Sequence, residues 1–303
     1  MPYWPFPGQE PLCAHGYTEY DAEIACSAES SNSHLPPSPP QTTPSSLLSV
    51  AYNINFNGLG GEGDPSKPPG LASITALLTS LSPDFVFLSE VSRGCTQYPN
   101  GAETLAESLN MSYAYAVEFI MLSSYDLTPT QESSYNTECT SGNAILSKYP
   151  LTDIRETRFS SNCCMYGRRA GTRSAISALA TLPSSAKISL HSTHLESGNE
   201  VEFLPAVFVR ANQALELATH ARTHAETNAA HSSIIGGDMN GPFRALDPFH
   251  LSFQYAGYTD AHQNLPASAR RTAEGTHDTG FLQTLGLQTL DYIFVHPPEV
   301  SPR

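Results

Sequence analysis

Residues 234–242, Ile-Ile-Gly-Gly-Asp-Met-Asn-Gly-Pro, join a β-prone apolar start to two polar side chains, with two glycines between them. The branched pair Ile234 and Ile235 favours a buried strand. Asp238 and Asn240 follow it, where α/β folds place their sites because the loops after strands converge in a cleft. The glycines are expected to let the backbone and a substrate approach closely. Taken alone, Asp238 also fits a helix cap or a turn. Other residues of the chain are therefore needed to distinguish a functional site from a structural role.

Four other polar residues occupy comparable positions. Asn53 ends the run LLSVAYN, Glu90 lies in FVFLSEV, His194 ends KISLHSTH, and Asp291 opens DYIFV. Each has a structural reading of its own: a turn, a solvated strand end, a hydrogen-bonded core histidine or a backbone cap. Together with Asp238 they form a set of strand-end polar groups that chance does not readily produce, which indicates a common site.

The strand and helix pattern predicts one large domain. Residues 1–46 are rich in Ser, Pro and Thr and are expected to form a disordered lead-in, and residues 47–303 are expected to form the domain. A strand, a helix over 71–81 and a second strand follow one another, which is typical of an α/β fold. Later strands come in pairs without intervening helices, which predicts two packed mixed sheets with helices outside. A helix over 205–223 is expected to bury a stripe of Leu204, Phe208, Ala211, Leu215 and Ala218.

Composition excludes several classes of protein. Lys and Arg total 15 and Asp and Glu total 29, so the net charge of −14 disfavours generic binding to duplex nucleic acid. The six cysteines contain no CxxC pair, which argues against a zinc ribbon but leaves a disulfide such as Cys95–Cys139 open. We expect no signal peptide and no membrane span, with a cytoplasmic or nuclear location favoured. The sequence does not indicate an oligomeric state. No G-x-S-x-G motif is present, which disfavours a serine hydrolase.

Six segments, in order, resemble one family. VAYNINFNG, FVFLSEV, GNAILSKYPL, HSTHLES, GGDMN and LDYIFV are similar to the motifs of the endonuclease/exonuclease/phosphatase superfamily, over about residues 47–295. The resemblance implies a DNase I-like four-layer α/β sandwich. It also implies Mg²⁺-dependent hydrolysis of phosphate esters, because the family includes nucleases, sphingomyelinases, inositol-phosphate phosphatases and 5′-tyrosyl-DNA phosphodiesterases.

The resemblance implies a metal site with few protein ligands. Glu90 matches the family's metal carboxylate, and Asn53 lies close by to bind the ion or to orient its shell. Mg²⁺ prefers oxygen ligands and keeps several waters, so one carboxylate, one amide and a substrate phosphate suffice. Mn²⁺ is expected to substitute.

The remaining roles concern water and phosphate. By resemblance, Asp238 orients and activates the attacking water, Asn240 positions the phosphate or Asp238, and His194 donates to a phosphoryl oxygen. Asn143 either borders the cleft and contacts phosphate or holds a turn. Arg173, with Arg168 and Arg169, either forms a local phosphate-binding edge or carries solvated charges.

Two departures from the family pattern stand out. Asp291 matches an aspartate that pairs with a histidine of a Ser-Asp-His motif, and no such motif precedes Arg303. We therefore expect a C-terminally incomplete domain that lacks its last strand. His296 is expected to point to the opposite face from Asp291. Ser89 replaces a common Gln, so a contact from this side chain to the site or its surroundings is expected to be missing.

Two functional hypotheses follow. The first is a metal-dependent phosphodiesterase or phosphatase acting on a small molecule or a nucleic-acid terminus. The alternative is a catalytically impaired or non-enzymatic relative that binds phosphoryl ligands, as the missing Ser-Asp-His suggests.

Overall fold

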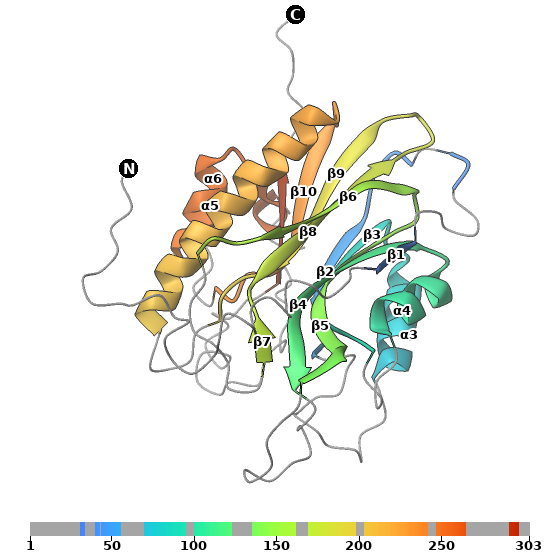
Figure 1. Ribbon diagram of the computed structural model, residues 1–303. Coiled ribbons are helices and arrows are strands. Elements are labelled where there is room, and N and C mark those ends of the chain that lie inside the picture. Colours follow the sequence, from blue (N-terminus) through green and yellow to red (C-terminus); the bar gives the residue numbers. More distant parts are fainter. Residues whose placement is uncertain are drawn as a thin grey trace, which may run out of the picture.

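Two six-stranded sheets pack face to face, and a pair of helices covers the outer face of each (Figure 1). The computed structural model describes residues 31–33, 40–42, 44–55, 70–94, 100–122, 135–161, 169–197, 203–241, 247–264 and 291–296. The layers run helix, sheet, sheet, helix, which confirms the predicted four-layer α/β sandwich.

The first sheet carries the strands that bear Asn53 and Glu90. Its order is β1 (Ser31–Ser33), β4 (Ser112–Leu122), β5 (Tyr135–Ser147), β3 (Phe85–Arg93) and β2 (Ser49–Asn53), with β7 (Arg169–Gly171) also paired to β4. β2 and β3 run parallel, joined through α3 (Leu71–Leu81), and the other pairs are antiparallel. α4 (Gly101–Leu109) packs beside α3 on the outer face.

The second sheet carries His194, Asp238 and Asp291. Its order is β11 (Thr259–Asp260), β12 (Asp291–His296), β10 (Ser232–Asp238), β9 (Lys187–His194), β8 (Ser174–Thr181) and β6 (Leu151–Arg158). β9 and β10 run parallel, joined through α5 (Phe203–Thr227), whereas β8–β9 is the predicted hairpin. α6 (Pro248–Tyr255) and the short η3 (Ala261–Asn264) precede the final strand.

Apolar side chains fill all three interfaces between the layers. One cluster lies under α3 and α4, a second between the sheets and a third under α5 and α6. In the middle interface, Phe85 and Phe87 of the first sheet are fully buried with Ile176 and Leu190 of the second. This central packing fixes how the two sheets meet, and therefore how their strand ends meet.

The predicted apolar stripe of α5 is partly wrong. Phe208 is 60% exposed and Leu215 is 43% exposed, while Ala218 is buried as expected. The buried face instead carries small alanines such as Ala214, which allow the helix to approach the sheet closely. It also carries Arg210 and Gln213, whose polar groups bind backbone beneath the helix.

Several predictions fall on residues that the structure does not describe. Most of the 1–46 lead-in lies outside the described residues, although β1 within it extends the first sheet. Arg168 and the side chains of Arg169 and of all six cysteines also lie outside them. Among the helices that are described, none combines the length and apolar character needed to cross a bilayer.

Candidate active site

The strand registers bring the predicted residues to one end of the two sheets. Asp238 lies directly across from His194 on β9 and from Asp291 on β12. Asn53 reaches across from the first sheet: its Nδ2 donates to Asp238 Oδ2 at 2.8 Å, and its backbone N–H donates to Asp291 Oδ1 at 3.1 Å. Asn53 therefore joins the two sheets at the site.

Asp238 and Asn240 form a tight polar turn after β10. The Asn240 backbone N–H donates to Asp238 Oδ1 at 2.8 Å, and Asn240 Nδ2 donates to Leu195 O at 2.9 Å. Asn240 adopts a left-handed conformation with φ of 50°, which asparagine tolerates better than most residues. These bonds fix one oxygen of Asp238, while Asn53 holds the other.

The two glycines of the opening motif serve sheet packing. A Cβ added to Gly236 would lie 2.4 Å from the Phe87 ring of the other sheet. A Cβ on Gly237 would lie 1.9 Å from Thr193 O on β9, and its φ of 141° disfavours any side chain. Where we expected the close approach of a substrate, the facing sheet approaches Gly236 and the neighbouring strand approaches Gly237.

Glu90 lies at a β-bulge. Leu88 pairs with Ala144 and Val91 with Gly142, so Ser89 and Glu90 together oppose Asn143 alone. Glu90 has a φ of 56°, a conformation costly for a residue with a side chain and concentrated at functional sites. Its side chain is partly exposed, and no described residue forms a hydrogen bond or an ion pair with it.

Negative charge accumulates around Asp291. Burial raises the pKa of this carboxyl well above its usual range, and the neighbouring Asp238 and Glu90 raise it further. The hydrogen bond from the Asn53 backbone offsets only part of this effect. Three acids, Asp291, Asp238 and Glu90, therefore lie near one another at these strand ends.

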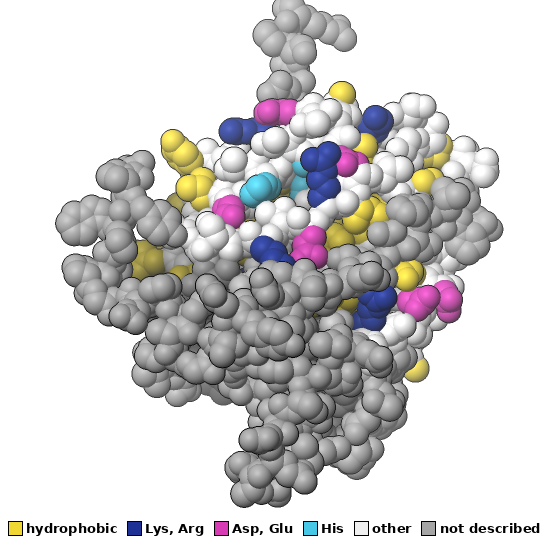
Figure 2. All heavy atoms as spheres, in the orientation of Figure 1, with side chains coloured by type: hydrophobic (Ala, Val, Ile, Leu, Met, Phe, Trp, Pro, Cys, Tyr) yellow, Lys and Arg dark blue, Asp and Glu magenta, His cyan; other side chains and the backbone are white. Residues whose placement is uncertain are grey.

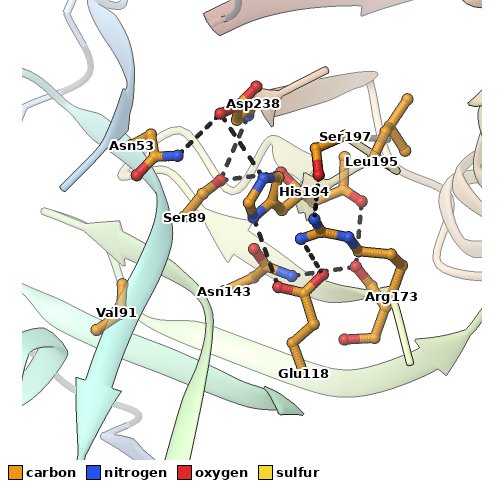
Figure 3. Close-up of polar contacts among 12 residues, drawn as sticks. Asn53, Ser89, Val91, Glu118, Asn143, Arg173, His194, Leu195, Ser197 and Asp238 are labelled. Carbon is orange, nitrogen blue, oxygen red and sulfur yellow. Dashed lines mark hydrogen bonds and ion pairs between the residues drawn. The ribbon is translucent and has the colours of Figure 1, made fainter. Parts of the chain in front are cut away.

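A buried charge network beneath His194 is the main feature that the sequence did not reveal (Figure 3). His194 Nε2 lies 3.7 Å from Asp238 Oδ2, and its Nδ1 faces Glu118 Oε2 at 3.6 Å. Arg173 Nη1 donates to Glu118 Oε1 at 3.1 Å. Glu118 is only 1% exposed, and a single acid inside the apolar strand YAYAVEFIML was the one available signal.

The network keeps Glu118 ionised. Burial alone raises the pKa of Glu118, but the Arg173 guanidinium and then His194 outweigh it, so the pKa is lowered. Arg173 is buried, packs over the Phe119 ring and donates to Ser197 Oγ. Arg173 is therefore neither the exposed phosphate-binding edge nor the solvated charge that we considered, because it is 3% exposed and pairs with Glu118.

Two further predicted positions resolve differently. Asn143 lies within β5, not in a turn, and its Nδ2 donates to Ser174 O of the other sheet at 3.1 Å. Its buried Oδ1 has no hydrogen-bond partner among the described residues. Ser89, expected to lack a contact, donates to Thr193 O at 3.1 Å and accepts from Asp238 N at 3.3 Å. That expectation was wrong, because the bulge brings a short side chain within reach of β9 and β10.

His296 lies at the far end of β12 from Asp291, with its ring against Tyr258 at 5.2 Å between centroids. It is therefore remote from the site, consistent with the expectation that it does not partner Asp291.

The donor set suits a cation that keeps most of its waters. Within the described ranges, no three His, Cys, Asp or Glu side chains are grouped closely enough to hold a metal ion between them. The oxygen-bearing groups at these strand ends are the carboxyls of Asp291, Asp238 and Glu90 and the amide of Asn53, whose Oδ1 accepts the Asn55 backbone N–H at 2.9 Å. Hard oxygen donors of low number fit Mg²⁺ or Mn²⁺ better than zinc, which takes nitrogen and sulfur ligands in closed tetrahedral sites.

The comparisons with known proteins show one family from the sequence and one fold from the solved structures. The sequence profile of the Endonuclease/Exonuclease/phosphatase family matches residues 50–303. An endonuclease/exonuclease/phosphatase from Beutenbergia cavernae superposes with a TM-score of 0.58 at 18% identity, over 83% of this chain. The present chain spans 64% of the length of that protein. No curated protein sequence matches the chain at a significant level.

Two further solved structures share the fold. The human Nocturnin catalytic domain with a bound sulfate anion gives a TM-score of 0.56 at 16% identity, covering 90% of this chain and 86% of that one. A β-hairpin deletion mutant of Staphylococcus aureus beta toxin gives 0.54 at 17% identity, covering 86% and 90%. At these identities the likeness concerns the fold alone.

Proposed function

The chain belongs to the endonuclease/exonuclease/phosphatase family, and from that membership we propose that it hydrolyses phosphate esters with the help of a divalent cation. The observation that carries the proposal is that Asn53, His194 and Asp238 meet at the ends of three strands, with Asn240 just after β10. Glu90 follows Ser89, whose hydroxyl accepts from the Asp238 backbone N–H. Among these groups, Asp238 contacts Asn53, His194 and Asn240 at once.

We propose Glu90 and Asn53 as the residues that would hold the cation, Mg²⁺ or Mn²⁺. Glu90 lies at a strained bulge near the other acids, and its carboxylate forms no hydrogen bond or ion pair with a described residue. When bound, the cation would polarise the phosphoryl oxygen and neutralise charge that develops there. The nearby acids Asp238 and Glu90, which add to the effect of burial in raising the pKa of Asp291, support the assignment.

We assign Asp238 the role of orienting the attacking water and accepting its proton. Asn53 Nδ2 and the Asn240 backbone N–H fix its two oxygens, so its free lone pairs have set directions. His194 would donate to a phosphoryl oxygen from its Nε2, while its Nδ1 faces Glu118 Oε2 at 3.6 Å without forming a hydrogen bond. Asn240 is tied to Leu195 O, which keeps the loops after β9 and β10 in register.

A small or terminal phosphoester is the substrate class that we favour. On the face shown in Figure 2, cationic side chains lie singly among acidic and uncharged ones. With a net charge of −14 over the chain, tracking of a long duplex backbone is unfavourable. A sulfate anion bound to the Nocturnin catalytic domain supports oxyanion binding by this fold.

Hydrolysis of bis(p-nitrophenyl) phosphate and of p-nitrophenyl phosphate tests the proposal. Activity on at least one of them is expected to stop with EDTA and to return with Mg²⁺ or Mn²⁺. His194→Ala, which removes one preorganised donor, is expected to lower kcat by roughly 10²- to 10³-fold. Glu226→Ala, an exposed acid on α5, serves as the control and is expected to match the wild type. Hydrolysis that survives both EDTA and His194→Ala would show that the assignment is wrong.

A further inference from the structure

The buried face of α5 carries a polar pair that grips the loop after His194. Arg210 is 0% exposed, and its Nη1 donates to Glu196 O at 3.0 Å and to Ser197 O at 3.5 Å. Gln213, one helical turn further, accepts from the Glu196 backbone N–H at 2.9 Å and donates to Ser161 O at 2.8 Å. Both backbone polar groups of Glu196 are therefore held by side chains of one helix.

The same arginine also reaches the element that follows the Asp238–Asn240 turn. Arg210 Nη2 donates to Asp247 Oδ2 at 3.1 Å, and Asp247 is fully buried. The other oxygen of Asp247 accepts from the Phe249 backbone N–H and so begins α6. One guanidinium thus joins α5, the loop after β9 and the start of α6.

This clamp lies two residues from His194 and connects to the network beneath it. Leu195, between His194 and Glu196, donates from its backbone to Asp238 O at 2.9 Å. Ser197 accepts from Arg173, which in turn pairs with Glu118. A displacement of Glu196 and Ser197 would therefore disturb His194 in two ways, through the backbone of Leu195 and through the contacts of Ser197 with Arg173 and Glu118.

We propose that Arg210 is a positioning residue, which sets the orientation of His194 by holding the Glu196–Ser197 loop. The inference rests on the proposed phosphoester hydrolysis. It adds that a residue of α5, which lies away from the strand ends, contributes to that reaction. A buried guanidinium suits the task because its planar fork donates in several fixed directions at once. Lysine has a single ammonium on a flexible stem and does not span the carbonyls and Asp247 together.

Two kinds of variant test the clamp. Arg210→Lys keeps the charge but loses the planar fork of the guanidinium. Gln213→Leu leaves Arg210 in place and removes the bonds of Gln213 to the Glu196 amide and to Ser161 O, so the test stays usable if the first variant folds poorly. Ala221→Gly destabilises α5 at a buried position away from the loop and is the matched control. Kinetics are measured well below the melting temperatures, with hydrogen exchange at the Glu196 amide as a second readout.

We expect Arg210→Lys to lower kcat by up to about 10²-fold, because small misplacements of a reacting group cost that much, with KM little changed. Exchange at the Glu196 amide should accelerate in Gln213→Leu and Arg210→Lys and stay slow in Ala221→Gly. The positioning role is overturned if kcat and exchange match the wild type, or if Ala221→Gly loses as much kcat. If the wild type hydrolyses no phosphoester, the proposed function fails, while the exchange data still report on the clamp.

Discussion

Replacing Glu118 by glutamine should reveal how much the fold depends on the charge network under His194. The carboxylate is 1% exposed and lies between Arg173, itself 3% exposed, and His194. Glu118→Gln keeps the size of the side chain but leaves a buried guanidinium facing a neutral amide. Breaking a buried ion pair from one side costs roughly 3–5 kcal/mol. Since glutamine still accepts one hydrogen bond, we expect the lower end, about 3 kcal/mol of unfolding free energy.

Urea unfolding of Glu118→Gln, Arg173→Met and the double variant at pH 7 measures this coupling. The double variant should be more stable than the sum of the single losses predicts, by at least about 1 kcal/mol, because it removes both charges together. Strictly additive losses would refute the network.

The same comparison has a defined pH dependence. The pKa of Glu118 is lowered from its ordinary 4.5, so its stabilising contribution is complete above that value and is lost as the pH falls through the lowered folded-state pKa. The stability difference between wild type and Glu118→Gln should therefore be constant near neutrality and shrink below about pH 4.5. A difference that grows in acid would contradict the direction of the shift.

Three further predictions concern other parts of the fold. Burial lowers the pKa of His191 and of His224 from 6.5, so below that pH the unfolded chain binds more protons than the folded chain. The midpoints of urea unfolding should therefore fall as the pH drops below about 6.5, and His191→Gln should make that decrease smaller. Gly237→Ala places a Cβ against Thr193 O at a left-handed φ and should cost at least about 3 kcal/mol or prevent folding, as thermal melts would show; a variant as stable as wild type is the opposite outcome. Phe208→Ser should change the free energy of unfolding by no more than about 0.5 kcal/mol, because this side chain is 60% exposed. A loss of several kcal/mol would show that Phe208 belongs to the buried face, as the sequence pattern predicted.

Local sequence patterns predicted the layers and the strand-end residues well. Branched apolar runs such as Ile234–Ile235 mark buried strands, and polar residues at their ends mark the place where loops converge. His194 and Asp238 end parallel neighbouring strands, so their meeting follows from strand alignment, whereas Asn53 reaches Asp238 only through the packing of the two sheets.

Long-range contacts escaped the sequence for physical reasons. Glu118 and Arg173 are 55 positions apart, on or beside strands of different sheets, so only the packing of the two sheets brings them together. The bulge at Glu90 depends on a register shift against β5 that no local pattern encodes. On α5, Phe208 fitted the helical period of the apolar residues, but it is exposed. The face of α5 that packs on the sheet instead carries alanines and Arg210.

Binding of Mn²⁺ by metal-free protein, followed by electron paramagnetic resonance together with phosphodiester hydrolysis, tests the central claim most directly. The wild type should bind about one ion per chain and recover hydrolysis over the same range of Mn²⁺ concentration. Glu90→Gln, which keeps the shape but removes the charge, should lose both, whereas Glu226→Ala on the surface of α5 should retain both. Equal Mn²⁺ binding and equal hydrolysis in Glu90→Gln and wild type would contradict a cation-assisted site at the ends of these strands.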